Sequence, residues 1–431
     1  RGRREATAAY PGPARPPGGG SHGGVPGTGT ASGGKPRRQL PHRDGTHTGR
    51  SPTARRREPP PWQHGRVRVV LVLRWFVVLA LVAVAAVTVY PDVLGIIDDR
   101  FTDLSMRAYV AQAIAMRPLI FLGMAGLALV VLVGSLVSRV GARRSARDAW
   151  PGDEPRQSRG RATFVLGVGL ALVAGAHGMI LGLRGIDANA TIAQGAGPGS
   201  PQAFTVLTYN TLGGAVTHDQ IAEVMASRDV DVAVLPETNA GTAERVQQDL
   251  AAAGRSYRLH TDATSGLDHS AIAVLVAEEL GGYSQTSGPE TMLASIRLDP
   301  LDTQSGAPTI VAVHPIAPAI GQMQRWRDEA YTVTDVCRAV PSEATPRLVM
   351  AGDFNTTRDH SAMHDLGGCR DAASESGTGA VATWPTSFPK LAGAAIDHVL
   401  VDDAAWRVTA SEVVDAGDSD HRGVIARLEA R

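Results

Sequence analysis

Cysteine is nearly absent from this chain, with 2 cysteines among 431 residues. So few thiols exclude a small fold held together by disulfides, and they exclude a zinc ribbon built from cysteine. Several catalytic motifs are missing as well: there is no Ser-His-Asp nucleophile elbow, no Walker loop and no HExxH zinc motif. Net charge is also lacking, because 42 Lys and Arg balance 42 Asp and Glu.

The charge balance conceals a basic segment at the start of the sequence. Residues 1–68 contain 14 Lys and Arg against 3 Asp and Glu, and they are rich in Gly and Pro. Such a segment cannot bury enough apolar surface to offset its chain entropy. We therefore expect residues 1–66 to form a disordered basic tail.

Three long apolar runs follow the tail, and each approaches the roughly 20 residues that cross a bilayer. Buried core helices of a soluble protein are the alternative, but those are usually shorter and amphipathic, whereas these runs are apolar all round. We therefore predict a membrane region over 67–184 with three transmembrane helices and a short linker after it. The helices are expected at about 69–90, 118–138 and 162–183, and the linker at 185–202.

The distribution of arginine predicts an orientation in the membrane. The tail is basic, the loop after the second run holds seven arginines between Arg139 and Arg161, and the loop after the first run is acidic by comparison. The positive-inside rule then places the tail and the second loop in the cytoplasm. Three crossings predict a multi-pass protein of the cell membrane whose C-terminal part is extracellular. His177 lies inside the third run, where we interpret it as a packed polar residue.

The remaining residues, 203–431, predict one α/β domain in which short β-rich runs alternate with helical stretches. Paired strands without an intervening helix favour a mixed sheet arrangement with helices outside. Strands are expected at 204–209, 231–236, 271–277, 292–298, 309–314, 347–352, 395–401, 406–414 and 423–429, and helices at about 217–228, 240–252 and 321–340.

Polar side chains gather where these strands begin or end, which is a usual place for a site built on a rigid sheet. Carboxylate and amide oxygens are hard ligands that suit Mg²⁺ or Mn²⁺, and the histidines are candidate proton carriers. The candidate residues are Asn210, Glu237, His314, Asp353, Asn355, Asp397, Asp420 and His421.

The short sequences around these residues resemble a known family. TYN, PET, VAVHP, GDFN, IDHVLV and SDHRG occur in the order seen in the endonuclease/exonuclease/phosphatase superfamily, over about 204–429. The membrane-anchored arrangement looks like that of bacterial members. The resemblance implies a DNase I-like, four-layer α/β sandwich that cleaves a phosphate ester with a divalent metal ion.

The resemblance also implies a role for each position. Asn210, Glu237 and Asp420 look like metal ligands, and Pro236 stands where Gln is common. Asp353 and Asn355 look like the pair that positions the nucleophile and the phosphate. His421 resembles the general base or an electrostatic partner of the phosphate, oriented by Asp397, and His314 resembles a general acid.

Other interpretations stay open at several positions. Asn210 and Asp353 can serve as turn residues, and Glu237 can cap the next helix. Trp384 can stack on substrate or pack in a loop, and Cys337 and Cys369 can pair. His398 is expected to be structural, and histidines without a motif, among them His360, are expected at the surface.

The sequence thus predicts a membrane-anchored phosphoesterase whose partners are the lipid bilayer and a phosphate ester, with no obligate protein partner evident. The ester can belong to nucleic acid, a phospholipid head group or a sugar phosphate. The absence of a basic stripe from 203–431 disfavours long nucleic acid. A binding or scaffolding module without activity is the alternative.

Overall fold

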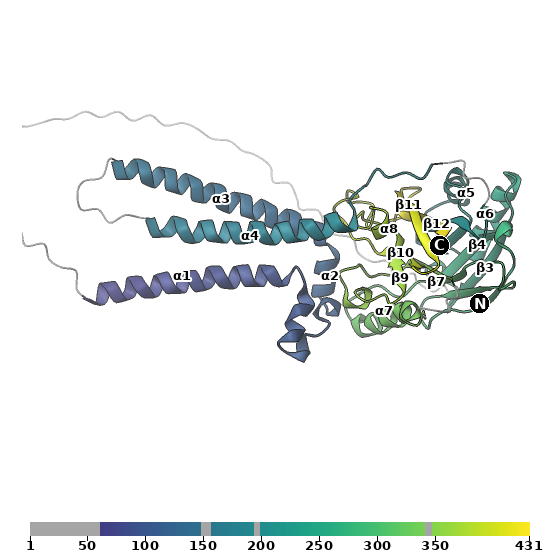
Figure 1. Cartoon of the computed structure of the whole chain (residues 1–431), viewed down its shortest axis with the longest axis horizontal. Coiled ribbons are helices and arrows are strands. Elements are labelled where there is room, and N and C mark those ends of the chain that lie inside the picture. The colour runs from purple at the N-terminus through teal and green to yellow at the C-terminus, as the bar shows by residue number, and fades with distance from the viewer. Residues whose placement is uncertain (1–60, 148–156, 194–198, 341–346) are drawn as a thin grey trace, which may run out of the picture. The chain divides into compact units, whose positions relative to one another are not determined.

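The computed structural model describes residues 61–147, 157–193, 199–340 and 347–431 of the chain (Figure 1). The predicted tail therefore lies outside the described residues, apart from its last few positions. From Pro61 onward the chain forms a helical region followed by an α/β domain, and the two belong to one compact unit.

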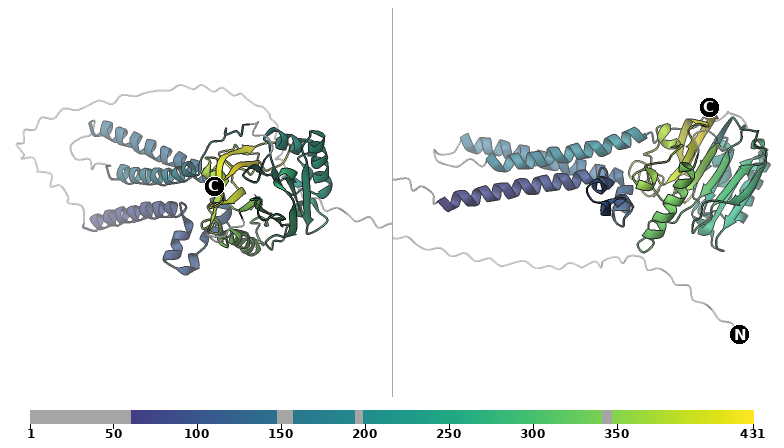
Figure 2. Two further views of the ribbon diagram at one scale, coloured as in Figure 1. Left: turned by 45° about the vertical axis from the view of Figure 1, so that its right-hand side comes forward. Right: turned by 60° about the horizontal axis from the view of Figure 1, so that its bottom comes forward.

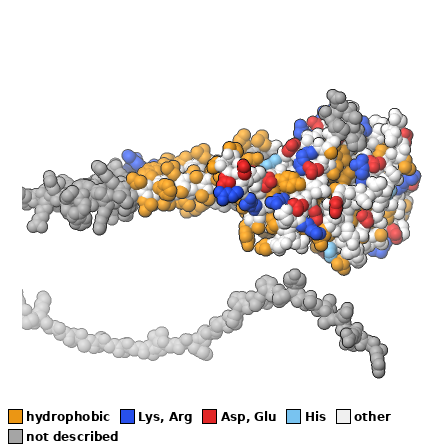
Figure 3. Space-filling view, turned by 90° about the horizontal axis from the view of Figure 1, so that it is seen from below, with side chains coloured by type: hydrophobic (Ala, Val, Ile, Leu, Met, Phe, Trp, Pro, Cys, Tyr) orange, Lys and Arg blue, Asp and Glu red, His pale blue; other side chains and the backbone are white. Residues whose placement is uncertain are grey.

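The helical region contains three long helices: α1 (Pro61–Val87), α3 (Arg117–Arg147) and α4 (Gln157–Arg184). Short 3₁₀ turns and α2 (Val110–Ala115) connect α1 to α3. Hydrophobic side chains dominate the described part of the helical region on the face that Figure 3 shows. Ala85, Ala128, Leu170 and Val173 form a small apolar cluster between them.

The prediction of three membrane spans needs correction, because two helices among the residues that the structure describes are long and apolar enough to cross a bilayer. These stretches are Arg117–Arg143 in α3 and Arg161–Arg184 in α4. In α1 the apolar stretch Val72–Val87 is shorter than the roughly 20 residues that a span requires.

The α/β domain is built on two six-stranded sheets that lie face to face (Figure 2). The first sheet has the order β11-β12-β1-β2-β4-β3 and the second the order β5-β6-β7-β8-β10-β9. The strands of the first are β1 (Ala203–Thr208), β2 (Val232–Pro236), β3 (Tyr257–Ala263), β4 (Ala271–Ala277), β11 (Trp406–Val414) and β12 (Gly423–Ala430). Those of the second are β5 (Tyr283–Ser287), β6 (Ile296–Pro300), β7 (Thr309–Val313), β8 (Leu348–Asp353), β9 (Cys369–Asp371) and β10 (Asp397–Asp402).

Alternating apolar residues divide the core into layers, because successive side chains of a strand point to opposite faces of its sheet. Val206 of β1 and Val234 of β2 pack against the second sheet. Their neighbours Leu207 and Leu235 face α5 (His218–Ser227) and α6 (Ala240–Ala252) instead. On the other side, α7 (Met323–Arg338) packs on the second sheet. The order helix, sheet, sheet, helix is the predicted four-layer sandwich.

Two other features of the domain bear on the predictions. Cys337 of α7 and Cys369 of β9 form a disulfide, which fastens the helix to the edge of the second sheet. The segment expected as a linker is attached to the domain where it is described. Asp187 N donates to Gly377 O at 3.0 Å, and Ile192 is buried and donates its N–H to Glu412 Oε2 at 2.8 Å.

Candidate active site

The candidate residues come from strand ends that meet at one edge of the two sheets. β1 and β2 are parallel, so Asn210 and Glu237, which follow them, lie at the same edge. β7 and β8 are also parallel, which places His314 beside Asp353. β10 runs the other way, and its first residue, Asp397, is paired with Asp353. The fold therefore brings these residues, which are far apart in the sequence, into one cluster.

The backbone at this edge is tightly constrained. A Cβ atom added to Gly352 would lie 1.9 Å from Val313 O, so only glycine allows β8 to approach β7 just before Asp353. Glu237 and Asn355 have φ values of 56° and 49°, in the left-handed region that non-glycine residues seldom occupy. Such conformations cluster at functional sites, where the surrounding structure maintains them.

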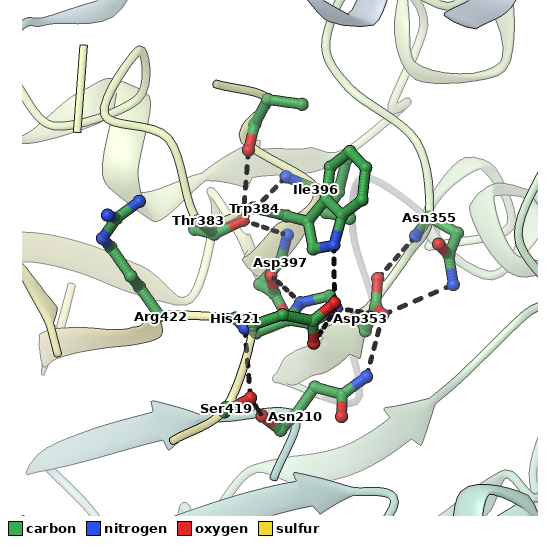
Figure 4. A network of polar contacts seen from close by, with 12 residues as sticks. Asn210, Asp353, Asn355, Thr383, Trp384, Ile396, Asp397, Ser419, His421 and Arg422 are labelled. Atoms are coloured by element: carbon green, nitrogen blue, oxygen red, sulfur yellow. Dashed lines mark hydrogen bonds and ion pairs between the residues drawn. The ribbon is translucent and has the colours of Figure 1, made fainter. Parts of the chain in front are cut away.

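Asp353 lies at the centre of the cluster (Figure 4). Its Oδ2 accepts a hydrogen bond from Asn210 Nδ2 at 3.1 Å, and Asn210 Nδ2 also lies 3.0 Å from Glu237 Oε1. His314 Nε2 and His421 Nε2 are each 3.7 Å from Asp353 Oδ2. The other oxygen, Oδ1, accepts the N–H of Asn355 at 2.8 Å. One carboxylate thus adjoins the amides and both imidazoles.

His421 is held by a buried carboxylate. Its Nδ1 lies 2.9 Å from Asp397 Oδ2, and the Asp397 side chain is 0% exposed. Ser419 Oγ accepts the N–H of His421 at 3.0 Å and donates to Asn210 O at 2.8 Å. This arrangement leaves Nε2 of His421 as the ring nitrogen beside Asp353.

Asp420 forms the exposed rim of the cluster, with a side chain that is 45% exposed. Trp384 Nε1 donates to Asp420 Oδ2 at 3.0 Å. The indole ring is itself partly exposed. Trp384 therefore orients Asp420, a candidate metal ligand. This role differs from the two that the sequence suggested, which were stacking on substrate and packing in a loop.

Burial and charge shift the protonation of these groups in different directions. Burial raises the pKa of Glu237 and of Asp353, and the nearby Asp397 charge adds to the effect at Asp353. Burial lowers the pKa of His314. Burial also disfavours the charged form of His421, but Asp397 and Asp353 outweigh it and raise the pKa of His421 to about 10.

The cluster contains all eight residues that the sequence singled out. Sequence reasoning did not identify the residues that support them. Besides Ser419, these include Thr383, whose Oγ1 accepts the N–H of Asp397 at 3.2 Å, and Arg422, which is buried and donates to carbonyls of the loop after Trp384. Ser419 and Arg422 flank Asp420 and His421 inside SDHRG, so the motif contained them without showing what they do.

The donor set fits a divalent metal ion. Four carboxylates, from Glu237, Asp353, Asp397 and Asp420, lie beside two imidazoles. Carboxylates so close together repel one another, and a bound cation would relieve that repulsion. Asp397 Oδ1 and Asp420 Oδ1 are buried atoms without a hydrogen-bond partner. Ligand atoms of Asp353, Asp397 and His421 lie within 4.8 Å of one another. Hard oxygen donors of this kind suit Mg²⁺ or Mn²⁺.

Comparison with known proteins gives one family and a set of distantly similar structures. Residues 207–421 match the model of the "Endonuclease/Exonuclease/phosphatase family". No curated protein matches the chain.

Among solved structures, an endonuclease/exonuclease/phosphatase from Beutenbergia cavernae is 20% identical, with a TM-score of 0.41 over 53% of this chain and 72% of that one. Danio rerio TDP2 bound to single-strand DNA product is 14% identical, with a TM-score of 0.44 over 53% and 99%. A mannosyl-6-phosphatase from Bacteroides thetaiotaomicron is 16% identical, with a TM-score of 0.40 over 52% and 99%.

The match spans the strand ends that carry the cluster, from Leu207 at the end of β1 to His421. The chain therefore belongs, through residues 207–421, to the endonuclease/exonuclease/phosphatase family.

Proposed function

We propose that the α/β domain hydrolyses a phosphate ester with the help of a divalent metal ion. The observation that supports this most directly is the joining of Asn210, Glu237, Asp353 and His421 through one network at a shared edge of two sheets. A protein that only binds a partner needs no such combination of crowded carboxylates and an oriented imidazole.

The side chains divide into two groups in this proposal. Glu237, Asn210 and Asp420 hold the ion, with Asp353 beside them. A divalent ion bound there supplies the positive charge that neutralises the phosphate oxygens and stabilises the leaving oxygen. Asp353 and Asn355 orient the attacking water and the phosphate. His421, fixed by Asp397, and His314 exchange protons with the attacking and leaving oxygens.

We also propose that α3 and α4 cross a membrane as a hairpin. Both ends next to the domain, Arg117 and Arg184, lie on the same side, and the segment between the helices is rich in arginine. The positive-inside rule assigns that segment to the cytoplasm and the domain to the outside. A disulfide in the domain fits an oxidising compartment.

Hydrolysis is tested on the full-length protein in detergent, with Mg²⁺, Mn²⁺ or EDTA. The substrates are plasmid DNA, sphingomyelin, phosphoinositides, a sugar phosphate and bis(4-nitrophenyl) phosphate. We expect turnover that EDTA abolishes and that Mg²⁺ or Mn²⁺ restores, and we expect Glu237→Ala and His421→Ala to remove it. Turnover that persists in both variants contradicts the assignment, and no turnover on any substrate favours a binding module.

Orientation is tested separately by protease digestion of intact cells that produce the full-length chain. Cleavage within the α/β domain without lysis is the expected result. Protection of the domain until the cells are lysed contradicts the proposed orientation.

A further inference from the structure

A second cavity, of about 480 Å³, lies where the end of α4 meets the α/β domain. Ile180, Leu183 and Arg184 line it from α4, and Arg358 and Ser374 line it from the domain. None of the eight candidate active-site residues contributes to it. The cavity is therefore a separate place on the molecule, with one apolar wall and one polar wall.

The polar wall contains hydrogen-bond donors without acceptors. Arg358 Nη1 and Ser374 Oγ are buried, and neither has a partner among the described residues. Buried polar groups are almost always hydrogen-bonded, so two orphaned donors beside one cavity indicate a missing acceptor. Burial lowers the pKa of Arg358, the charges of Arg184 and Arg370 add to this shift, and those of Asp371 and Asp359 oppose it.

Positive side chains also gather at this wall, where Arg184 and Arg358 line the cavity. Arg184 Nη2 and Arg117 Nε contact one oxygen, Asp359 Oδ1, at 2.6 and 2.7 Å. Two guanidinium groups thus share a single carboxylate, although Arg117 does not line the cavity, and Arg358 adds a positive charge that Asp371 partly offsets. Glu375 is the one acidic side chain lining this cavity, and it is exposed. An anion that accepts several hydrogen bonds matches this wall.

The apolar wall belongs to a helix that is long and apolar enough to cross a bilayer. Leu183 is 74% exposed and stands next to Arg184, the last residue of α4. Tyr90, just after α1, also lines the cavity. Arginine and tyrosine at the end of an apolar helix mark the depth at which lipid head groups lie. A ligand that fits both walls has a phosphate at one end and hydrocarbon at the other.

We propose that this cavity binds the head group of an anionic phospholipid. Arg358 and Ser374 donate to the phosphate oxygens, Arg184 adds positive charge, and the start of an acyl chain lies against Ile180 and Leu183. The proposal depends on the membrane insertion of α3 and α4 proposed above, but not on phosphate-ester hydrolysis.

The test is a lipid titration of the full-length protein in detergent, followed by thermal unfolding. The additions are phosphatidylglycerol, phosphatidylcholine and inorganic phosphate. We expect phosphatidylglycerol to raise the Tm at lower concentration than either of the others. An equal response to inorganic phosphate identifies a site for free phosphate, and an equal response to phosphatidylcholine shows that the anionic head group is not recognised; either overturns the proposal.

Substitutions in the cavity test whether the rise in Tm with phosphatidylglycerol arises there. Arg358→Met and Ser374→Ala should each weaken the apparent affinity for phosphatidylglycerol, by roughly tenfold for the arginine, because a charge-assisted hydrogen bond is lost. Glu375→Gln should strengthen binding by removing repulsion. Arg407→Gln is the matched control. Arg407 is exposed and pairs with Glu429, and neither residue lines the cavity.

Folding of the variants is checked without lipid. Ser374→Ala removes only an orphaned donor, so its lipid-free Tm should not fall. Arg358→Met also removes a charge that favours the ionised form of Asp371, so Ser374→Ala decides if Arg358→Met fails to fold. Wild-type affinity in the folded variants overturns the proposal. Flotation of the full-length protein with vesicles tests insertion separately, and hydrolysis of bis(4-nitrophenyl) phosphate should be unchanged in both variants.

Discussion

Replacing Asp397 with asparagine tests the arrangement around His421 most directly. Asp397 Oδ2 lies 2.9 Å from His421 Nδ1, and the Asp397 side chain has no exposed surface. Substrate therefore cannot touch Asp397, and an effect on catalysis passes through its two neighbours, the His421 imidazole and the Asp353 carboxylate. Asparagine has nearly the same size but no charge, so the ring loses the group that fixes its orientation and stabilises its protonated form.

The expected loss can be estimated from what the imidazole contributes. Proton transfer by a positioned side chain accounts for roughly 10²–10⁴ in rate, or about 2.7–5.5 kcal/mol of barrier. Asp397→Asn should lower kcat by a factor within that range. KM should change little, because the buried carboxylate makes no contact with substrate. The assay is steady-state hydrolysis of bis(4-nitrophenyl) phosphate by the full-length protein.

The chain offers a matched control in a second buried Asp–His pair. Asp371 Oδ2 lies 2.6 Å from His398 Nδ1, both side chains are buried, and His398 is adjacent to Asp397 in β10. Although burial opposes it, the charges of His398 and Arg358 lower the pKa of Asp371 to about 2. The ionised carboxylate therefore stabilises the fold above pH 3.8, and this stabilisation is lost as pH falls through about 2.

Asp371→Asn should accordingly cost about 2 kcal/mol of stability at neutral pH and leave kcat per folded molecule unchanged. The two variants thus separate catalysis from stability, which thermal unfolding measures alongside the kinetics. Equal kcat losses in both variants, or a wild-type kcat in Asp397→Asn, would refute the role assigned to the Asp397–His421 pair.

Three further predictions concern the scaffold around the site. Gly352→Ala should unfold the second sheet or displace Asp353, because the new Cβ would lie 1.9 Å from Val313 O; a wild-type Tm and kcat would contradict this. Burial raises the pKa of Asp231 to about 6, so the wild type should lose stability as pH rises from about 4 to about 6, and denaturant titrations of Asp231→Asn should lack that slope. Replacing Cys337 and Cys369 together with Ala should cost about 3–4 kcal/mol, because their sequence separation is 32 residues; a Tm that matches the wild type and is insensitive to reductant would show that they do not pair.

Strong local patterns made much of the domain predictable from the sequence. The prediction gave the observed bounds of α6, β4 and β11, because α6 has a helical periodicity and the other two are continuous β-rich runs. β3, β5 and β9 were missed. β3 and β5 are edge strands with exposed polar residues, and β9 has only three residues. Such strands exist because a neighbouring strand pairs with them, and single-sequence patterns do not show that.

The site was predictable for a different reason. Its residues stand beside buried strands, and the motif order suggested that the strand ends converge. The supporting hydrogen bonds were not visible, because they join distant positions. Ser419 bonds the backbone of Asn210, which is 209 residues away in the sequence. Thr383 bonds the backbone N–H of Asp397 from a loop that belongs to neither sheet. Neither serine nor threonine has a sequence pattern that distinguishes such a contact.

The junction between the helices and the domain shows the same limit more strongly. His360 was expected at the surface but is buried, with Nε2 3.1 Å from Ala111 O in α2. His177 is packed as expected, and its ring lies between Thr88 and Arg117. Arg117, the first residue of α3, is buried and bonds Asp359, four residues after Asn355. Removing one partner of a buried ion pair destabilises a protein by several kcal/mol. The pair between Arg117 and Asp359 therefore holds the loop that follows Asn355 against the start of α3. A charge in a sequence reveals its sign, but only the folded chain reveals the distant partner that neutralises it.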